Sequence, residues 1–419
     1  MSENGYKIVA EIAAHEGPVR SLCIGPLGEI VSGAQDSSVK RWGLSEKPSG
    51  RDIEVVFDQF GSGLPHNHWI VSLSSLSPGK LEIYPEGCII TGCQDSNIRL
   101  FDTLGNLLNT LQGHSKGVIS FSWTPSLQLI SGSWDGTARI WDLTTGQCVQ
   151  VLPNHENGVH VLGLSDGSIA TTSTGEQVND RPGNFFLRFW DATTGKQLTP
   201  PRSDHTGSIR GLTACGPMGS QGIATSANDG SVVIRTLDGE PLVVHSHPLQ
   251  EDGCAPFVLD VIRLEEEEGK GKEGSVSLLS CGEDGSIMIW DMSGSLQSVP
   301  HPVCCWTAVP LPGGDFVTAG HDGVIRLFSK NKQKQSSETA TTLQMQFLVE
   351  VEDTISRRRA ALQGGNAAEI AKAPAWDARG GYVGKSDGET KIFNAGGKGI
   401  AAQWSATSSS WIEIGEVVG

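Results

Sequence analysis

The sequence predicts a mainly β protein built from about seven copies of one short repeat, followed by a small C-terminal segment of mixed α and β structure. Three observations carry this prediction. A strand–turn–strand pattern with an Asp in its turn recurs along the first three quarters of the chain, and a His precedes each copy. The chain also holds 53 Gly and 11 Trp, which suits many short strands joined by tight turns.

The clearest copy of the pattern runs from Leu129 to Asp142, where Asp135-Gly136 form the turn between two alternating strands. The other copies are Ile30 to Trp42, Ile89 to Asp102, Ile223 to Arg235, Leu278 to Asp291 and Phe316 to Phe328, with a degenerate copy ending at Phe189-Trp190-Asp191. Their spacing is roughly 40 to 60 residues. Where the spacing is longer than a regular repeat, we assign the extra residues to interruptions such as Gly175 to Asn184 and Glu265 to Gly274.

The upstream histidines complete a recognisable unit. They are His15, His66 or His68, His114, His155, His205, His247 and His301. This unit resembles the WD40 repeat, and the resemblance implies a seven-bladed WD40 β-propeller over residues 1–329. It also implies a buried hydrogen-bonded chain in each blade. The best set is His114, Ser131 or Ser133, Asp135 and Trp141, and the further structural blade residues are Asp229, Asp284 and Trp290.

The N-terminal segment has a predicted place in this ring. After Phe328 the chain turns polar and supplies no fourth strand for the last blade, whereas Tyr6 to Ile12 form an apolar-rich strand before the first His. We expect this strand to close the ring against the last blade, which would leave no long exposed sheet edge.

The rest of the chain divides into a linker at 330–373, partly helical from Leu343 to Ala373, and a Gly-rich segment at 374–419. The motifs around Ile392-Phe393, Trp404 and Trp411 resemble the first part of the PFU ubiquitin-binding module, with Trp404 and Trp411 as core residues. The order of parts, and blade stretches such as Ile83 to Gly87 and Cys304-Cys305-Trp306, resemble the phospholipase A-2-activating protein (PLAA) family. The resemblance implies ubiquitin, single or in chains, as the partner.

The end of the chain departs from that family. It stops at Val418-Gly419, where family PFU modules continue and a helical-repeat domain follows. We therefore expect a partial PFU domain, and no docking on the AAA segregase that the helical-repeat domain binds.

Bulk composition narrows the function classes. A formal net charge of −16 disfavours a phosphate backbone, so we expect no nucleic-acid partner. The nine scattered Cys do not suggest a disulfide framework, the N-terminus has no apolar signal core, and no run of about 18 apolar residues would insert in a membrane. These features predict a protein of the cytoplasm and nucleus.

Catalytic and cofactor motifs are weak, so the sequence predicts no enzyme and no cofactor or metal. Gly269 to Gly274 match a dinucleotide pattern without the required strand and helix, and Arg379 replaces the first glycine of a P-loop ending at Ser386. The pairs His66/His68 and His245/His247 lack further metal ligands nearby. Three lipase-like G-x-S-x-G matches, at Ser115, Ser165 and Ser386, have no helical pattern after the serine.

Partner binding is predicted on the propeller rim. The residues before the turn Asp tend to face one end of a WD40 ring, and residues that begin the innermost strands, including His160, face nearby. The candidate partner-binding residues are Arg20, Trp69, Trp134, Arg210, Asn228 and Glu283. For both tryptophans, packing between blades is the competing interpretation. We interpret the chain as a ubiquitin-binding scaffold in ubiquitin-dependent protein turnover and ubiquitin homeostasis. The alternative is a generic WD40 scaffold with a non-functional, truncated PFU segment.

Overall fold

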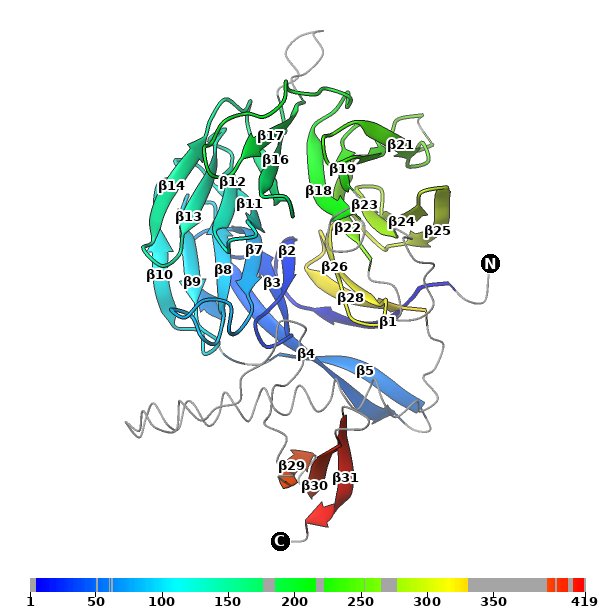
Figure 1. Cartoon of the computed structure of the whole chain (residues 1–419). Helices are drawn as coiled ribbons and strands as arrows, with labels where there is room; N and C mark the ends of the chain where they lie inside the picture. Colours follow the sequence, from blue (N-terminus) through cyan, green and yellow to red (C-terminus); the bar gives the residue numbers. More distant parts are fainter. Residues whose placement is uncertain are drawn as a thin grey trace.

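The computed structural model describes residues 5–49, 52–59, 61, 63–175, 185–215, 222–251, 253–264 and 277–330, and three strands between 390 and 417. In the described part, seven antiparallel sheets stand as blades around a common axis (Figure 1). This arrangement confirms the predicted seven-bladed propeller. Among the described residues, no helix is long and apolar enough to cross a membrane.

Six blades follow one another in chain order. Blade 1 holds β2 (Val19–Ile24), β3 (Ile30–Ala34), β4 (Ser38–Ser49) and β5 (Asp52–Gln59), and β6 (Leu64–Pro65) also pairs with β4; blade 2 holds β7 (Ile70–Leu76), β8 (Cys88–Cys93), β9 (Ile98–Phe101) and β10 (Leu107–Leu111); blade 3 holds β11 (Val118–Trp123), β12 (Leu129–Ser133), β13 (Ala138–Asp142) and β14 (Gln147–Leu152). Blade 4 holds β15 (Val159–Gly163), β16 (Ser168–Ser173) and β17 (Leu187–Asp191); blade 5 holds β18 (Ile209–Cys215), β19 (Gly222–Ala227), β20 (Ser231–Arg235) and β21 (Pro241–Ser246); blade 6 holds β22 (Val258–Arg263), β23 (Leu278–Gly282), β24 (Ser286–Asp291) and β25 (Gly294–Pro300).

Blade 7 closes the ring with strands from both ends of the propeller. It holds β26 (Cys305–Pro310), β27 (Phe316–Gly320) and β28 (Val324–Ser329), and its outer strand is β1 (Lys7–Ala13). Strand β1 runs antiparallel to β28, with Ile12 opposite Ile325 and Ala13 opposite Val324. The prediction that the N-terminal strand closes the ring is therefore confirmed. The pairing joins residues that lie about three quarters of the chain apart, and it covers the edge that β28 would otherwise expose.

The innermost strands β2, β7, β11, β15, β18, β22 and β26 contact one another in sequence, and β26 returns to β2. Small residues in the second strand of a blade allow this approach. A Cβ atom added to Gly132 on β12 would lie 2.0 Å from the carbonyl oxygen of Val159, which begins the next blade's innermost strand. All five residues of β12 are buried, because a neighbouring blade covers each face of the sheet. Between the blades lie apolar clusters, such as the one that joins Val19 and Ile30 of blade 1 to Val317 and Ile325 of blade 7.

Two parts of the ring are irregular. In blade 4 no fourth strand is present among the described residues; isolated bridges from Leu187 to Arg202 and from Trp190 to Gln197 occupy its outer edge. In blade 1 the hairpin of β4 and β5 is unusually long and extends beyond its blade (Figure 1).

Beyond the propeller, residues 331–389 lie outside the described residues, and so do the predicted linker and partial helix. In the predicted PFU segment, the backbone forms an antiparallel sheet of β29 (Thr390–Ala395), β30 (Lys398–Ser405) and β31 (Ser410–Val417). The backbone of Trp404 pairs with that of Trp411 across β30 and β31. The side chains of these strands lie outside the described residues.

Candidate functional site

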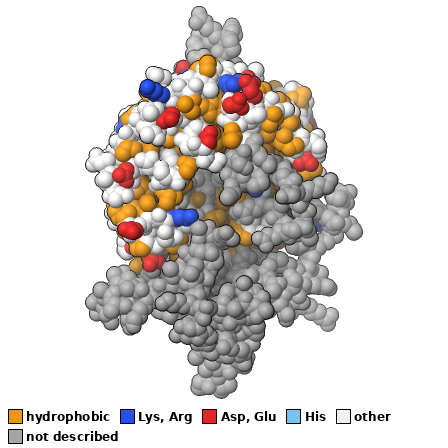
Figure 2. Space-filling model, in the orientation of Figure 1, with side chains coloured by type: hydrophobic (Ala, Val, Ile, Leu, Met, Phe, Trp, Pro, Cys, Tyr) orange, Lys and Arg blue, Asp and Glu red, His pale blue; other side chains and the backbone are white. Residues whose placement is uncertain are grey.

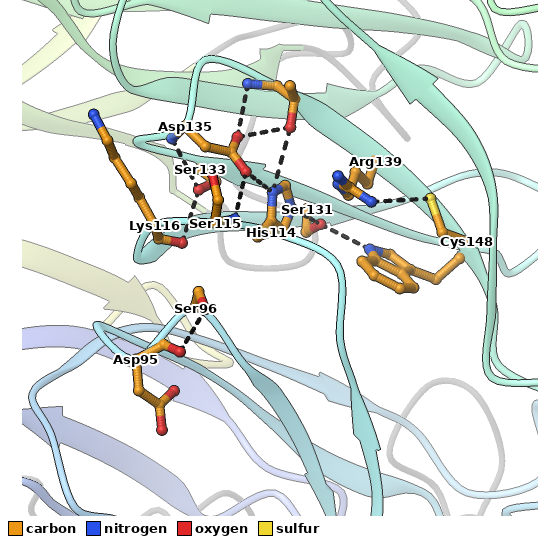
Figure 3. Close-up of polar contacts among 12 residues, drawn as sticks. Asp95, Ser96, His114, Ser115, Lys116, Ser131, Ser133, Asp135, Arg139 and Cys148 are labelled. Carbon is orange, nitrogen blue, oxygen red and sulfur yellow. Dashed lines mark hydrogen bonds and ion pairs between the residues drawn. The ribbon is translucent and has the colours of Figure 1, made fainter.

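Blade 3 contains a continuous hydrogen-bonded chain across its turn (Figure 3). His114 Nδ1 lies 2.8 Å from Asp135 Oδ2, and His114 Nε2 lies 2.8 Å from Ser131 Oγ. The indole N–H of Trp141 donates to the same Ser131 Oγ at 2.8 Å. A carboxylate only accepts, so Nδ1 carries a proton and donates to Asp135. Of the two serines left open by the sequence, Ser131 joins the chain. Ser133 instead donates to the carbonyl oxygen of Lys116.

The same histidine position recurs in every blade. In each, Nε2 lies 2.7–3.1 Å from a Ser or Thr hydroxyl of the second strand; the pairs are His15–Ser32, His66–Thr91, His114–Ser131, His155–Thr171, His205–Thr225, His247–Ser280 and His301–Thr318. His66 rather than His68 occupies this position. Trp290 donates to Ser280 at 2.7 Å, whereas Asp284 binds Ser286, which in turn lies 2.9 Å from His247. Asp229 lies 3.2 Å from His205.

Blade 5 replaces the tryptophan with arginine, a feature that the sequence interpretation missed. Arg235 is buried, and its Nε–H donates to Thr225 Oγ1 at 3.3 Å, where a tryptophan N–H donates in blade 3. Its guanidinium also forms an ion pair with Asp204. The signal in the sequence is the residue ten positions after the second-strand hydroxyl, which is Arg235 after Thr225 and Trp141 after Ser131.

His245, the other member of the predicted pair His245/His247, also has structural partners. His245 Nε2 lies 2.9 Å from the carbonyl oxygen of Asp291, and its ring stacks on Trp290 with centroids 4.9 Å apart. Within the described ranges, no three His, Cys, Asp or Glu side chains are grouped so as to hold a metal ion. Ser115 and Ser165 lie in connections between strands, with no helix after them. The Gly269 to Gly274 and Ser386 motifs lie outside the described residues.

One end of the ring, which we call the top face, gathers the predicted partner-binding residues. A backbone hydrogen bond of 2.8–3.1 Å repeats there in all seven blades, from the residue before or at the turn to the residue that precedes the innermost strand. The donors are Gln35, Gln94, Trp134, Thr174, Asn228, Glu283 and His321; the acceptors are Pro18, Trp69, Gly117, Gly158, Ser208, Phe257 and Cys304. The repeated bond fixes fourteen backbone positions on one rigid surface.

The two candidate tryptophans differ in how they are held. Trp69 is 50% exposed, and its equivalent in blade 6, Phe257, is 41% exposed. Trp134 is half-buried, because its indole lies against Gly117 at the start of its own blade and Gly158 at the start of blade 4. A Cβ atom added to Gly158 would come within 2.7 Å of Trp134 Cδ1. Packing between blades thus uses part of the Trp134 surface, whereas much of the Trp69 surface faces solvent.

A second ring of residues lies next to this surface. The second residue of each innermost strand is Arg20, Val71, Ile119, His160, Arg210, Leu259 or Trp306, and we call this set the second-position ring. In six of the seven strands the register shifts across this residue; β15 is regular. Val71 therefore corresponds to Arg20. Trp69 corresponds instead to Pro18, the residue that directly precedes β2, because both carbonyl groups accept the repeated backbone hydrogen bond.

Electrostatics within the second-position ring are dominated by burial. The Arg20 guanidinium lies over the Trp306 ring, 3.7 Å from its centroid, and burial together with the charge of Arg210 lowers the pKa of Arg20 to about 10. Arg210 Nε–H donates to Asn228 Oδ1 at 3.2 Å. Burial lowers the pKa of Arg210, and the charge of Glu283 opposes that effect. Burial and then Arg210 lower the pKa of His160 to about 3, so this imidazole is neutral at pH 7.

The viewed face of the propeller is mixed in character (Figure 2). Hydrophobic side chains lie in small groups among Lys, Arg, Asp and Glu, and no broad area of this face carries a single charge. Specific contacts by a few side chains would therefore determine which partner binds.

Buried histidines predict that acid destabilises the propeller. Burial lowers the pKa of His155 and His160 to about 3 and that of His247 to about 4. An unfolded histidine titrates near 6.5, so the folded state binds fewer protons below that pH and loses stability as the pH falls toward 3. Asp260 acts in the opposite direction, because burial raises its pKa to about 6 and its protonation favours the folded state.

Three histidines destabilise the folded state as the pH falls, and only Asp260 opposes them, so the histidines should determine the net change in stability. We expect the free energy of unfolding to fall by at least ~2 kcal/mol between about pH 7.5 and pH 4.5, measured by urea denaturation. Asp260→Asn removes the opposing group and should make the decline steeper. A stability that stays level over this interval would show that these histidines are not held neutral.

Known proteins resemble this chain in both sequence and fold. A family model for the WD domain, G-beta repeat, matches residues 6–43, 105–142 and 272–291. The ubiquitin homeostasis protein lub1 of Schizosaccharomyces pombe is 27% identical over 421 residues, which cover 99% of this chain and 51% of lub1. The phospholipase A-2-activating protein of Xenopus laevis is 34% identical over 158 residues, or 37% of this chain and 18% of that protein.

Other WD-repeat proteins match as well. Pre-mRNA-processing factor 19 of Bos taurus is 36% identical over 121 residues, which cover 28% of this chain and 23% of the relative. Among solved structures, the crystal structure of the WD40 β-propeller domain of Doa1 covers 78% of this chain and 98% of its own, with a TM-score of 0.59 and 21% identity. This chain spans about half the length of lub1 and less than a quarter of the other two relatives.

Proposed function

Because this chain is a WD40 propeller homologous to lub1 and to the phospholipase A-2-activating protein family, we propose that it is a ubiquitin-binding scaffold in ubiquitin-dependent protein turnover and ubiquitin homeostasis. The observation that carries the proposal is the extent of the similarity to lub1. That similarity runs along 99% of this chain, including the C-terminal segment, and is not confined to the repeats. The name of that relative refers to ubiquitin homeostasis.

The top face supplies the contact surface in this proposal. Trp69 offers a large aromatic side chain to solvent. Arg20 and Arg210 belong to the second-position ring, and Asn228 and Glu283 lie next to Arg210. Aromatic and arginine side chains on a rigid scaffold are the residues that most often anchor protein interfaces. The fold itself serves many scaffolds, so the assignment of the partner rests on the homology.

A generic scaffold for another complex is the second candidate. One observation favours it: a stretch of this chain is 36% identical to pre-mRNA-processing factor 19, whose name does not refer to ubiquitin. WD40 repeats are thus shared by proteins with different names, and repeat similarity alone does not identify a partner.

Titration of isotope-labelled ubiquitin with the full chain distinguishes the two. We expect selective changes in ubiquitin amide shifts, and about a tenfold weaker affinity with Trp69→Ala if Trp69 anchors the contact. Leu242→Ala is the matched control, because Leu242 is 52% exposed but lies on the outer strand β21. The absence of any shift would sink the ubiquitin proposal and leave the generic scaffold. Equal effects of the two substitutions would exclude the top face as the contact.

A further inference from the structure

Two arginines of the second-position ring lack the carboxylate partner that most other described arginines have. Arg41, Arg99, Arg188, Arg202, Arg235 and Arg326 each form an ion pair with Asp or Glu. Among the described residues, no carboxylate lies within ion-pair distance of Arg20 or Arg210. Arg20 instead contacts the Trp306 ring, and the positive charge of Arg210 acts on it. Arg210 donates from Nε–H to Asn228.

An independent observation lies beside Arg20. The indole Nε1–H of Trp306 is buried and has no hydrogen-bond acceptor in the described part of the chain. A buried donor without a partner costs about 1–3 kcal/mol, so such groups mark places where a ligand or water supplies an acceptor. In blades 3, 4 and 6, by contrast, the N–H groups of Trp141, Trp190 and Trp290 each have a hydroxyl acceptor.

We propose that Arg20, Arg210 and the Trp306 N–H form a binding site for a carboxylate group of a peptide. A guanidinium presents parallel N–H groups that match the two oxygens of a carboxylate. The local charge fits a single negative charge, because Glu283 offsets part of the Arg210 charge and His160 is neutral. Val71 and Leu259 of the same ring, with Trp69 and Phe257 on the top face, give the carboxylate an apolar setting suited to a peptide.

The inference deepens the proposed function, because it names the chemical group that a partner would place on the top face. Its test uses no protein partner, so the two proposals can fail separately.

The probe is acetate, added to the isotope-labelled full chain while the indole N–H signal of Trp306 is followed by NMR; Trp306→Phe assigns the signal. We expect a saturable shift with acetate that chloride at equal ionic strength does not produce. Arg20→Gln and Arg210→Gln should each weaken the apparent affinity by about tenfold or more, since each removes charge-assisted hydrogen bonds.

Arg263→Gln is the matched control, because Arg263 ends the innermost strand β22 at the opposite end from Val258 and has no ion pair among the described residues. It should leave the acetate response unchanged. The indole signal of Trp141 reports whether each variant keeps its fold. A response to phosphate but not to acetate would overturn the carboxylate assignment. No saturable response, or an equal response in Arg20→Gln, would overturn the site itself.

Discussion

Replacing Glu29 by Ala should lower the free energy of unfolding by about 3–5 kcal/mol, the usual cost of removing one member of a buried ion pair. Both side chains of the pair are almost fully buried, with 0% of Glu29 and 2% of Arg41 exposed. Arg41 Nε–H donates to Glu29 Oε1 at 3.1 Å, and its Nη1 donates to the carbonyl oxygen of Thr103 in blade 2 at 2.8 Å. Without Glu29, a positive charge would remain buried between two blades.

Urea denaturation of three variants would test this account. Glu240→Ala is the surface control: Glu240 pairs with Arg202 at 2.8 Å, but 57% of its side chain is exposed, so we expect a loss below about 1 kcal/mol. The double substitution Glu29→Leu with Arg41→Met removes both charges and should recover much of the loss. If the double variant is no more stable than Glu29→Ala, the cost comes from packing rather than from an orphaned charge.

The repeat pattern alone was enough to predict the architecture, because the residues of each repeat indicate the strands and the turn of one blade. The closing strand was also predictable, since Phe328 is followed by polar residues and the apolar strand at the N-terminus had no other partner. The pair Arg41 and Glu29 was not found. Both residues lie in blade 1, but Arg41 is also held by a hydrogen bond to the carbonyl oxygen of Thr103 in blade 2. A contact between blades of this kind cannot be read from the repeat pattern.

Pairs of equivalent candidates also needed the structure. His66 and His68 are two residues apart, and only the position of Thr91 on the second strand selects His66. The first residue of each innermost strand had a similar effect: β2 begins at Val19 and β7 at Ile70, which places Val71 rather than Trp69 level with Arg20. The exact start of a strand leaves no clear mark in a single sequence, because it depends on pairing with the neighbouring strand. Trp306 was missed for the same reason, although the stretch that contains it was singled out.

Substitutions of two tryptophans in blade 3 separate stability from binding. Trp141 is 1% exposed, packs in an apolar cluster with Leu129 and Val118, and donates to Ser131. We expect Trp141→Ala to cost about 3–5 kcal/mol in unfolding free energy, from the lost burial and the cavity that remains. Trp134→Ala should cost about 1 kcal/mol, because part of that ring already faces solvent.

A conservative change at Trp141 divides its large effect into parts. Blades 2 and 7 carry Phe101 and Phe328 where blade 3 carries Trp141, and both are buried to 1% exposure. A phenyl ring is therefore compatible with this position, and Trp141→Phe should lose mainly the hydrogen bond to Ser131, about 1 kcal/mol. In thermal and urea unfolding, Trp141→Ala should be far less stable than either Trp141→Phe or Trp134→Ala. The affinity for ubiquitin should change with Trp134→Ala and not with the two substitutions of Trp141. A Trp141→Phe variant as unstable as Trp141→Ala would mean that the hydrogen-bonded chain, rather than the buried ring, carries the stability of the blade.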